Sequence, residues 1–155
     1  MSVIILREIT RENWREALQL SVHPDQQRFV ADYQPIVMIG LAKAYVSPLG
    51  LTWLPYAIYD RHEMIGFVEL ALDVDSTDDY WMYHFFIDQR YQGQGYGKQA
   101  LASLIEHIER NYPECRSISL TVHPDNLPAQ RLYTAAGFIR TSEEAFGEPL
   151  FRLAL

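Results

Sequence analysis

The feature that most constrains this chain is a glycine-rich run at residues 90–98, R-Y-Q-G-Q-G-Y-G-K. It follows an aromatic, strand-like segment at residues 80–88 and precedes a helix-like segment at residues 99–111. Glycines tolerate positive φ and the close approach of a ligand, and the first turn of a helix offers unpaired N–H groups and the positive end of its dipole. The run therefore predicts a loop whose backbone amides bind an anion such as a pyrophosphate.

The positions of the glycines exclude two commoner phosphate-binding motifs. A Walker loop needs a glycine with four residues between it and Gly-Lys, and Ser or Thr afterwards, but those places hold Gln92 and Gln99. The dinucleotide fingerprint G-x-G-x-x-G fails because the glycines are Gly93, Gly95 and Gly97, and because no acidic residue ends a second parallel strand. On its own, so short a pattern is also compatible with a structural turn.

Length and composition indicate a soluble protein with one domain over residues 1–155. A chain of 155 residues can bury about 70% of the surface that its unfolded form exposes. No apolar stretch reaches the roughly 18 residues that cross a bilayer, and the first residues do not resemble a signal peptide. Cys115 is the only cysteine, so no intrachain disulfide forms, and we expect a cytoplasmic location.

The formal net charge of −7 argues against nucleic acid as a partner, since phosphate binding needs clustered Lys and Arg. It weakly favours small cationic substrates. Taken alone, however, the charge is better explained by a role in solubility.

Strand-like and helix-like segments alternate along the chain. Apolar and β-branched runs predict strands at residues 2–9, 54–59, 64–72, 80–88, 117–122, 138–141 and 150–155. We expect helices at residues 11–21 and 99–111, a third that ends at Gly137, and short helical turns over 22–50, the longest at 36–45. A hairpin turn is predicted at residues 60–63 and a polar turn at residues 73–79. This order indicates a mixed α/β sheet.

A second motif, N-L-P-A-Q-R-L-Y-T-A-A-G-F, occupies residues 126–138. Together, R-x-x-G-x-G-x-G-K and N-x-x-A-x-x-L-Y-x-x-x-G-F resemble the two acetyl-coenzyme A motifs of the GCN5-related N-acetyltransferase (GNAT) family, in the expected order. The resemblance extends over roughly residues 52–140. It implies the α/β (α+β) GNAT fold, a mixed central sheet of about seven strands with a central splay, flanked by helices.

The resemblance also implies that the pantetheine arm of acetyl-coenzyme A lies along residues 80–88. A splayed strand has unpaired N–H and C=O groups that can bind an amide-bearing ligand, and an N–H there can stabilise the oxyanion formed from the thioester. The cofactor-binding residues expected on this basis are Phe85, Phe86, Ile87, Arg90, Gln92, Gly93, Gln94, Gly95, Tyr96, Gly97, Lys98, Asn126 and Ala129.

Tyr133 matches the family tyrosine that protonates the departing coenzyme A thiolate, so we expect it to be the general acid. A phenol with a reference pKa of about 10 stays protonated at neutral pH and can donate to a thiolate in a hydrogen-bonded complex. The structural alternative is a half-buried aromatic that fills a groove. Asn126 likewise has an alternative role as the N-cap of its helix.

The base that deprotonates the attacking amine is left open by the sequence. In polyamine acetyltransferases with a similar strand, a carboxylate often occupies the position of Tyr83, and this chain departs from that pattern. His84 has a suitable intrinsic pKa, but strand alternation predicts that it lies on the opposite face from Tyr83 and Phe85 and is structural. Glu69 or Asp73, acting through water, are further candidates.

Residues 22–30, 65–67 and 85–88 resemble bacterial spermine/spermidine or diamine acetyltransferases, which implies a polyamine substrate. Other amines, such as a protein N-terminus, an aminoglycoside or an amino acid, remain alternatives, as does a non-catalytic acyl-coenzyme A sensor. Several carboxylates could line a groove for a polycation, although each is also explained as an ordinary solvated side chain. These are Asp25, Asp32, Glu69, Asp73, Asp75, Asp78 and Asp79.

The histidines and the single cysteine of the chain indicate neither a metal site nor a covalent acyl-cysteine intermediate. The five histidines show no metal-binding spacing, and Cys115 lies outside both motifs. We therefore expect direct transfer in a ternary complex without a metal, in which positioning supplies up to about 7–11 kcal/mol. No membrane partner is expected, and the resemblance allows a homodimer because dimers are common among relatives.

Overall fold

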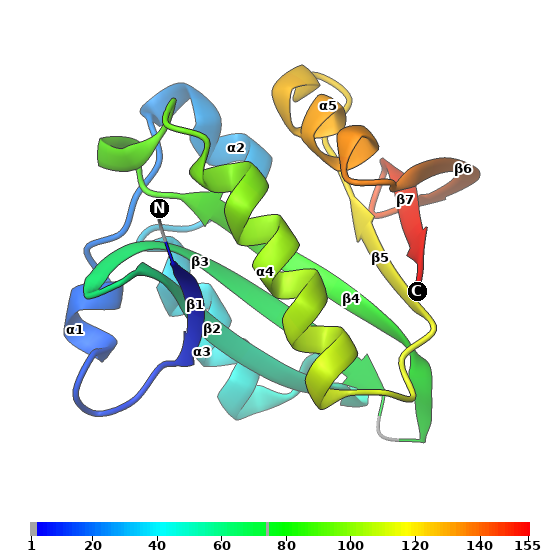
Figure 1. Cartoon of the computed structure of the whole chain (residues 1–155), viewed down its shortest axis with the longest axis horizontal. Helices are drawn as coiled ribbons and strands as arrows, with labels where there is room; N and C mark the ends of the chain where they lie inside the picture. Colours follow the sequence, from blue (N-terminus) through cyan, green and yellow to red (C-terminus); the bar gives the residue numbers. More distant parts are fainter. Residues whose placement is uncertain (1–2, 74) are drawn as a thin grey trace.

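The computed structural model describes residues 3–73 and 75–155, apart from the side chains of residues 76 and 77. Its described residues form one seven-stranded mixed sheet in the order β1-β2-β3-β4-β5-β7-β6, which confirms the predicted fold class (Figure 1). The strands are β1 (Ile4–Glu8), β2 (Thr52–Asp60), β3 (Glu63–Asp73), β4 (Ser76–Ile87), β5 (Ser117–Thr121), β6 (Ile139–Ala145) and β7 (Glu148–Ala154). Within this part of the chain, no helix is both long and apolar enough to span a bilayer.

The sheet opens between its two central strands. β4 and β5 run parallel, and in the described residues their ladder extends from the pair Asp79–Ser117 to the pair Trp81–Ser119. Beyond Trp81 the two strands diverge, as Figure 1 shows. The edge of β4 that faces β5 is therefore without a strand partner along residues 82–87, as the predicted splay requires.

Helices cover both faces of the sheet. α4 (Tyr96–Asn111) packs on one face through Ala100, Leu101, Leu104 and Ile108, whereas α1 (Trp14–Ala17) and α3 (Ile36–Val46) cover the other (Figure 1). α2 (Gln27–Val30) and α5 (Leu127–Ala135) lie at the end of the sheet where β4 and β5 have diverged. Three short 3₁₀ turns complete the fold, namely η1 (Pro24–Gln26), η2 (Pro48–Gly50) and η3 (Gln89–Tyr91).

The predicted helix over residues 11–21 is wrong, because α1 is only four residues long. Helical spacing continues in the sequence, but tertiary hydrogen bonds turn the chain away after Leu20. The N–H of Ser21 donates to Asp88 Oδ2 at 2.9 Å, and the N–H of Gln89 donates to the Ser21 carbonyl at 2.8 Å. The N-cap of α1 is Asn13, which makes no side-chain capping bond, and Thr10 Oγ1 accepts from the N–H of Glu12 in the turn that precedes the helix.

Other boundaries also differ from the prediction: β6 runs to Ala145 instead of residue 141, and two further differences lie on either side of β4. The polar turn expected at residues 73–79 is shorter, because β3 extends to Asp73 and β4 begins at Ser76; Val74 lies outside the described residues. The helix expected from Gln99 begins three residues earlier, at Tyr96, with Gly95 as its N-cap at φ 83°. The first turn of α4 is therefore part of the glycine-rich run itself.

A bulge interrupts β4 next to the splay. Tyr83 pairs with Glu69 and Phe86 pairs with Phe67, so that two residues of β4 oppose a single residue of β3. His84 adopts φ 53° at this point. The bulge breaks the alternation of side chains along β4 within the segment, residues 82–87, that borders the splay.

Candidate active site

A cleft of about 380 Å³ lies between the free edge of β4 and α5, and we call it the β4–α5 cleft. Its walls come from the end of β4, the glycine-rich loop, α5 and the segment of η1 and α2. Ten of the predicted cofactor-binding residues line it, together with Tyr133: Phe85, Phe86, Ile87, Gln92, Gly93, Gly95, Tyr96, Gly97, Asn126 and Ala129. The structure thus brings both sequence motifs to one cavity.

The glycine-rich loop turns through two positive-φ residues, Gly93 at φ 80° and Gly95 at φ 83°. A side chain there would be strained, so glycine allows the sharp turn that starts α4 beside the cleft. The amide of Gln92 donates to the Ile87 carbonyl at 2.9 Å and pairs with the amide of Gln26 at 3.0 Å. Gln92 therefore fixes the loop against β4 and η1. Its bond to the Ile87 carbonyl uses one of the backbone groups that were predicted to bind the pantetheine arm.

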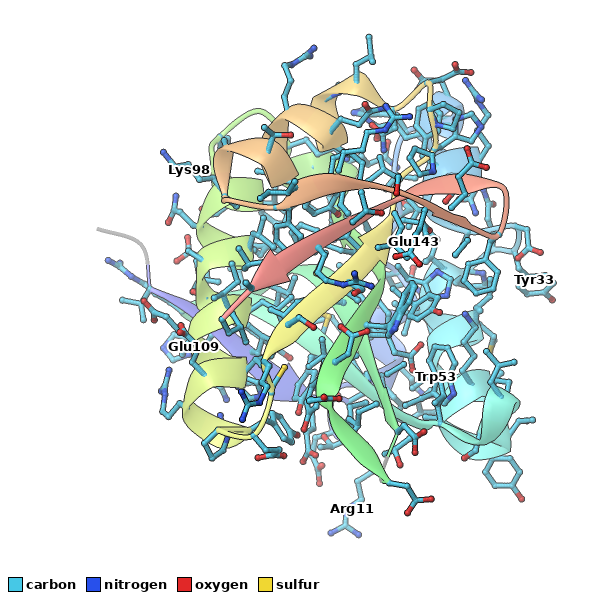
Figure 2. All side chains as sticks on the ribbon, turned by 90° about the vertical axis from the view of Figure 1, so that its right-hand side faces the viewer. Arg11, Tyr33, Trp53, Lys98, Glu109 and Glu143 are labelled. Carbon is cyan, nitrogen blue, oxygen red and sulfur yellow. The ribbon has the colours of Figure 1, made fainter. Side chains whose placement is uncertain are left out.

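Arg90, Gln94 and Lys98 are not among the residues that line the cleft. Arg90 Nε lies 2.7 Å from Oδ1 of Asp88, a carboxylate that is 1% exposed and that also binds the Ser21 amide, so this arginine holds the start of the loop. Gln94 and Lys98 are exposed, and Lys98 lies at the periphery of the molecule in Figure 2. A role for these three residues in binding the cofactor stays a prediction.

Tyr133 lines the cleft from α5 and faces the end of β4. Its ring centroid lies 6.4 Å from that of Phe85 and 5.6 Å from that of Phe138. Burial raises the pKa of this phenol well above its ordinary value, so the hydroxyl keeps its proton at neutral pH. The raised pKa also makes the phenol a weaker acid, so it can give its proton to a thiolate only transiently, within a hydrogen-bonded complex.

Asn126 and Tyr96 have structural bonds in addition to their places in the cleft. Asn126 Oδ1 accepts from the N–H of Ala129 at 3.3 Å, which confirms the predicted N-cap of α5. The Tyr96 hydroxyl donates to Asp60 Oδ2 at 2.6 Å and ties the first turn of α4 to the end of β2.

A second cavity of about 480 Å³ lies on the α3 side of β4, and we call it the β2–β4 pocket. It shares two wall residues, Phe29 and Val30 of α2, with the β4–α5 cleft, so the two cavities adjoin at α2. Trp53 of β2 and Tyr83 of β4 form an aromatic wall, with ring centroids 4.9 Å apart. Figure 2 shows Trp53 on the side of the sheet that α3 covers.

His84 faces the same pocket as Tyr83, and the prediction that alternation separates them is wrong. The bulge in β4 rotates His84 toward α2 and α3, where its Nδ1 lies 2.8 Å from the Val30 carbonyl and its Nε2 lies 2.8 Å from Lys43 Nζ. Both ring nitrogens therefore have partners. Burial, together with the charge of Lys43, lowers the pKa of His84 to about 4.

Glu69 lies beneath α3, close to Gly40, and is 0% exposed. Within the described residues, neither carboxylate oxygen has a hydrogen-bond partner. Burial raises the pKa of Glu69 to about 8, although the nearby ammonium of Lys43 opposes the shift. Glu69 and Asp73 are not among the residues that line either cavity, so no direct contact supports either as the base.

Of the acidic residues expected to bind a polycation, some lie at the two cavities and others line neither. Asp25 borders the β4–α5 cleft and Asp32 borders the β2–β4 pocket. Asp73, Asp75 and Asp78 lie at or next to the β3–β4 turn, at the opposite end of β4 from the splay. Asp79 accepts hydrogen bonds from Ser117 and Ser119 and so has a structural role in the β4–β5 ladder.

Sequence reasoning missed most of the second pocket. Its charged and aromatic walls include Lys43 of α3, Phe146 of the β6–β7 turn and Glu148 of β7, in addition to Trp53. These residues come from three separate segments and belong to no motif. Trp53 lies just outside the strand predicted at residues 54–59, so none of these residues was singled out from the sequence.

Among the described residues, no group of three His, Cys, Asp or Glu side chains is arranged to hold a metal ion. The β4–α5 cleft combines a glycine-rich loop at the start of a helix, a buried phenol and a free strand edge. In combination these suit the transfer of an acyl group from a bound thioester.

Comparison with known proteins agrees with this site. Residues 6–138 match the acetyltransferase (GNAT) family. A spermine/spermidine N(1)-acetyltransferase from Bacillus subtilis (strain 168) is 31% identical over 140 residues, which are 87% of each chain. The solved structure of spermidine N-acetyltransferase from Vibrio cholerae, in complex with CoA and spermine, superposes with a TM-score of 0.71 at 18% identity, over 98% of this chain and 94% of that one.

An aminoglycoside acetyltransferase in complex with coenzyme A superposes with a TM-score of 0.76 at 20% identity, over 98% of this chain and 95% of that one. Likeness at this level of identity shows the fold, and the family match together with the Bacillus relative shows the family. The chain therefore belongs to the acetyltransferase (GNAT) family, and it is an N-acetyltransferase.

Proposed function

We propose that this protein transfers the acetyl group of acetyl-coenzyme A to a primary amine of a polyamine, such as spermine, spermidine or a diamine. The cofactor occupies the β4–α5 cleft, with its pyrophosphate on the amides of the glycine-rich loop and its pantetheine arm along Phe85–Ile87. The amine enters from the β2–β4 pocket. The arrangement is supported by the adjoining cavities, which meet at Phe29 and Val30 beside the splayed end of β4.

The transfer proceeds by direct attack in a ternary complex. The amine nitrogen forms a bond to the thioester carbon, and a free N–H on the edge of β4 stabilises the oxyanion that develops. The C–S bond then breaks and the departing thiolate takes the proton of the Tyr133 hydroxyl, while the nitrogen releases its surplus proton to water. Water returns a proton to Tyr133, so that the products are the N-acetylated amine and free coenzyme A.

The polyamine assignment is carried by the Bacillus relative, which is 31% identical and named as a spermine/spermidine acetyltransferase. The pocket adds chemical support. Aromatic faces of Phe29 and Phe146 attract cations, and Asp32 and Glu148 border the same space. A linear substrate with several ammonium groups can place one amine near the splay and a distal cation near these carboxylates.

An amine panel tests the assignment. Purified protein is incubated with acetyl-coenzyme A and, separately, spermine, spermidine, putrescine, an aminoglycoside, lysine and a short peptide with a free N-terminus, and thiol release is measured. We expect kcat/KM for the polyamines to exceed the other values at least tenfold. A preference for the aminoglycoside or the peptide would contradict the substrate class, and thiol release with none of the amines would contradict the transferase proposal itself.

A further inference from the structure

The ammonium group of Lys43, on the wall of the β2–β4 pocket, contacts a histidine and two aromatic rings. Its Nζ lies 2.8 Å from His84 Nε2, 4.7 Å from the ring centroid of Trp53 and 4.8 Å from that of Tyr83. The carbonyl of Val30 can only accept, so His84 Nδ1 carries the ring proton and Nε2 is the acceptor for Lys43. Two aromatic faces and a neutral imidazole contact the ammonium group at this point and favour it, whereas burial lowers the pKa of Lys43 from its ordinary value.

This arrangement leaves neither His84 nor Tyr83 free to act as a base. The lone pair of His84 is engaged by Lys43, and protonation of the ring would place two positive charges 2.8 Å apart. Tyr83 is a neutral phenol whose pKa burial raises further. An amine that binds beside His84 and Tyr83 meets the cation of Lys43 in place of a proton acceptor.

The other charged groups near Lys43 do not neutralise its positive charge at neutral pH. Glu69 from β3 is the nearest buried carboxyl, and burial keeps most of it protonated below a pKa of about 8. Asp32, between α2 and α3, is exposed and screened by water. Arg28 of α2 and Glu148 of β7 border the same pocket with opposite charges.

We propose that the ammonium of Lys43 activates the acceptor amine by electrostatic repulsion, favouring its unprotonated form in the β2–β4 pocket; this rests on the proposed function. A like charge nearby disfavours the protonated form of an amine, as does removal from water. The substrate ammonium gives its proton to water before attack, and the free amine then forms the C–N bond. Lys43 itself gains and loses no proton, and no protein general base is needed.

The pH dependence of kcat tests this, because kcat reports ionisations within the bound complex. The comparison is between wild type, Lys43→Met and Lys43→Arg at saturating concentrations of the best acceptor of the panel. Arg110→Met, at the far end of α4 on the other face of the sheet, controls for net charge. Circular dichroism and calorimetry with coenzyme A confirm that each variant folds, and Lys43→Gln replaces Lys43→Met if the methionine variant does not fold.

We expect Lys43→Met to move the acidic limb of the kcat profile upward by about one pH unit, which lowers kcat at pH 7 about tenfold. Lys43→Arg and Arg110→Met should keep the wild-type midpoint. Trifluoroethylamine is already unprotonated at neutral pH, so Lys43→Met should leave its acetylation rate nearly unchanged. An unmoved midpoint in Lys43→Met, or an equal loss with both amines, would overturn the role of Lys43, whereas inactivity of the wild type would refute the proposed function instead.

Discussion

In the proposed reaction, the hydroxyl of Tyr133 donates the proton that the departing thiolate takes up. Tyr133→Phe keeps the ring between Phe85 and Phe138 and removes only the proton donor. Loss of a general acid costs about 10²–10⁴ in rate, so we expect kcat to fall at least about 100-fold. Calorimetry should show unchanged affinity for coenzyme A.

The matched control for this variant is Tyr112→Phe. That hydroxyl contacts the Tyr56 hydroxyl at 3.4 Å, and Tyr112 lines neither cavity. We expect wild-type kcat for Tyr112→Phe. Equal turnover of Tyr133→Phe and the wild type would remove Tyr133 from the mechanism and leave it as a groove-filling aromatic.

Glu69 makes the stability of the fold depend on pH. Its pKa is about 8 in the folded state and near 4.5 in the unfolded chain, so the folded state binds more protons between these values. The stabilisation is complete below about pH 4.5, and the free energy of unfolding then falls as the pH rises to about 8. Glu69→Gln cannot titrate, and relative to the wild type it should gain at least about 2 kcal/mol between pH 5 and pH 8.

Urea unfolding of both proteins from pH 5 to pH 8 measures this difference. Glu109→Gln is the control, because Glu109 is exposed on α4, on the other side of the sheet from Trp53 (Figure 2). It should follow the wild-type slope. Parallel stability curves for Glu69→Gln and the wild type would show that Glu69 is ionised in the folded protein throughout this range.

At the scale of secondary-structure elements, the sequence predicts most strands and the two motif-bearing helices. Local signals suffice there, since α4 has a regular apolar face and α5 has its Asn126 cap and a C-terminal glycine, Gly137, at φ 103°. The helix expected at residues 11–21 fails because Asp88, 67 residues away from Ser21, competes for its backbone. No local pattern contains that contact.

The same distinction applies to the site. The β4–α5 cleft was largely predictable, because its walls are two contiguous motifs joined by a short strand and a helix. The β2–β4 pocket was not, since its walls come together only through packing. The bulge at His84 shows the difference most clearly: alternation assigns the wrong face to a residue whose φ of 53° is set by the surrounding structure.

Gly66 of β3 allows β4 to approach closely where the cleft begins. A Cβ at this position would lie 2.5 Å from the backbone oxygen of Phe86, which cannot move without shifting β4. We expect Gly66→Ala to lose about 2–3 kcal/mol of stability, as other overpacked sites do, and to bind coenzyme A more weakly. Urea unfolding and calorimetry measure the two effects.

Gly97→Ala provides the comparison for stability. Its Cβ would lie 3.6 Å from Leu132 Cδ2, an ordinary contact, and Gly97 lies within the first turn of α4. Ala is favoured over Gly in a helix by roughly 0.5–1 kcal/mol, so this variant should be at least as stable as the wild type. Wild-type stability in Gly66→Ala would mean that β4 yields easily at this point.

At the scale of the whole molecule, the sheet consists of two halves joined along a short ladder. β1–β4 and β5–β7 meet through the pairs Asp79–Ser117 to Trp81–Ser119, and the cleft separates them beyond. A ligand in the cleft contacts both halves and binds only the folded state. At 100 times its Kd it adds about 2.7 kcal/mol of stability, which raises Tm by several degrees in a protein of this size.

Variants at two glycines in comparable turns can distinguish the rise in Tm caused by the ligand from the loss of Tm caused by local strain. Gly93 (φ 80°) lies in the loop of the β4–α5 cleft, whereas Gly147 (φ 75°) lies in the β6–β7 turn, and a Cβ at either would meet no atom within 4 Å. Val is strained at positive φ, so Gly93→Val and Gly147→Val should lower the Tm of the free protein similarly. Only Gly93→Val should lose the rise in Tm with coenzyme A, measured by differential scanning calorimetry. If both variants kept the full rise, the loop amides would not hold the diphosphate, and the cofactor would have to be anchored to the two halves by other groups.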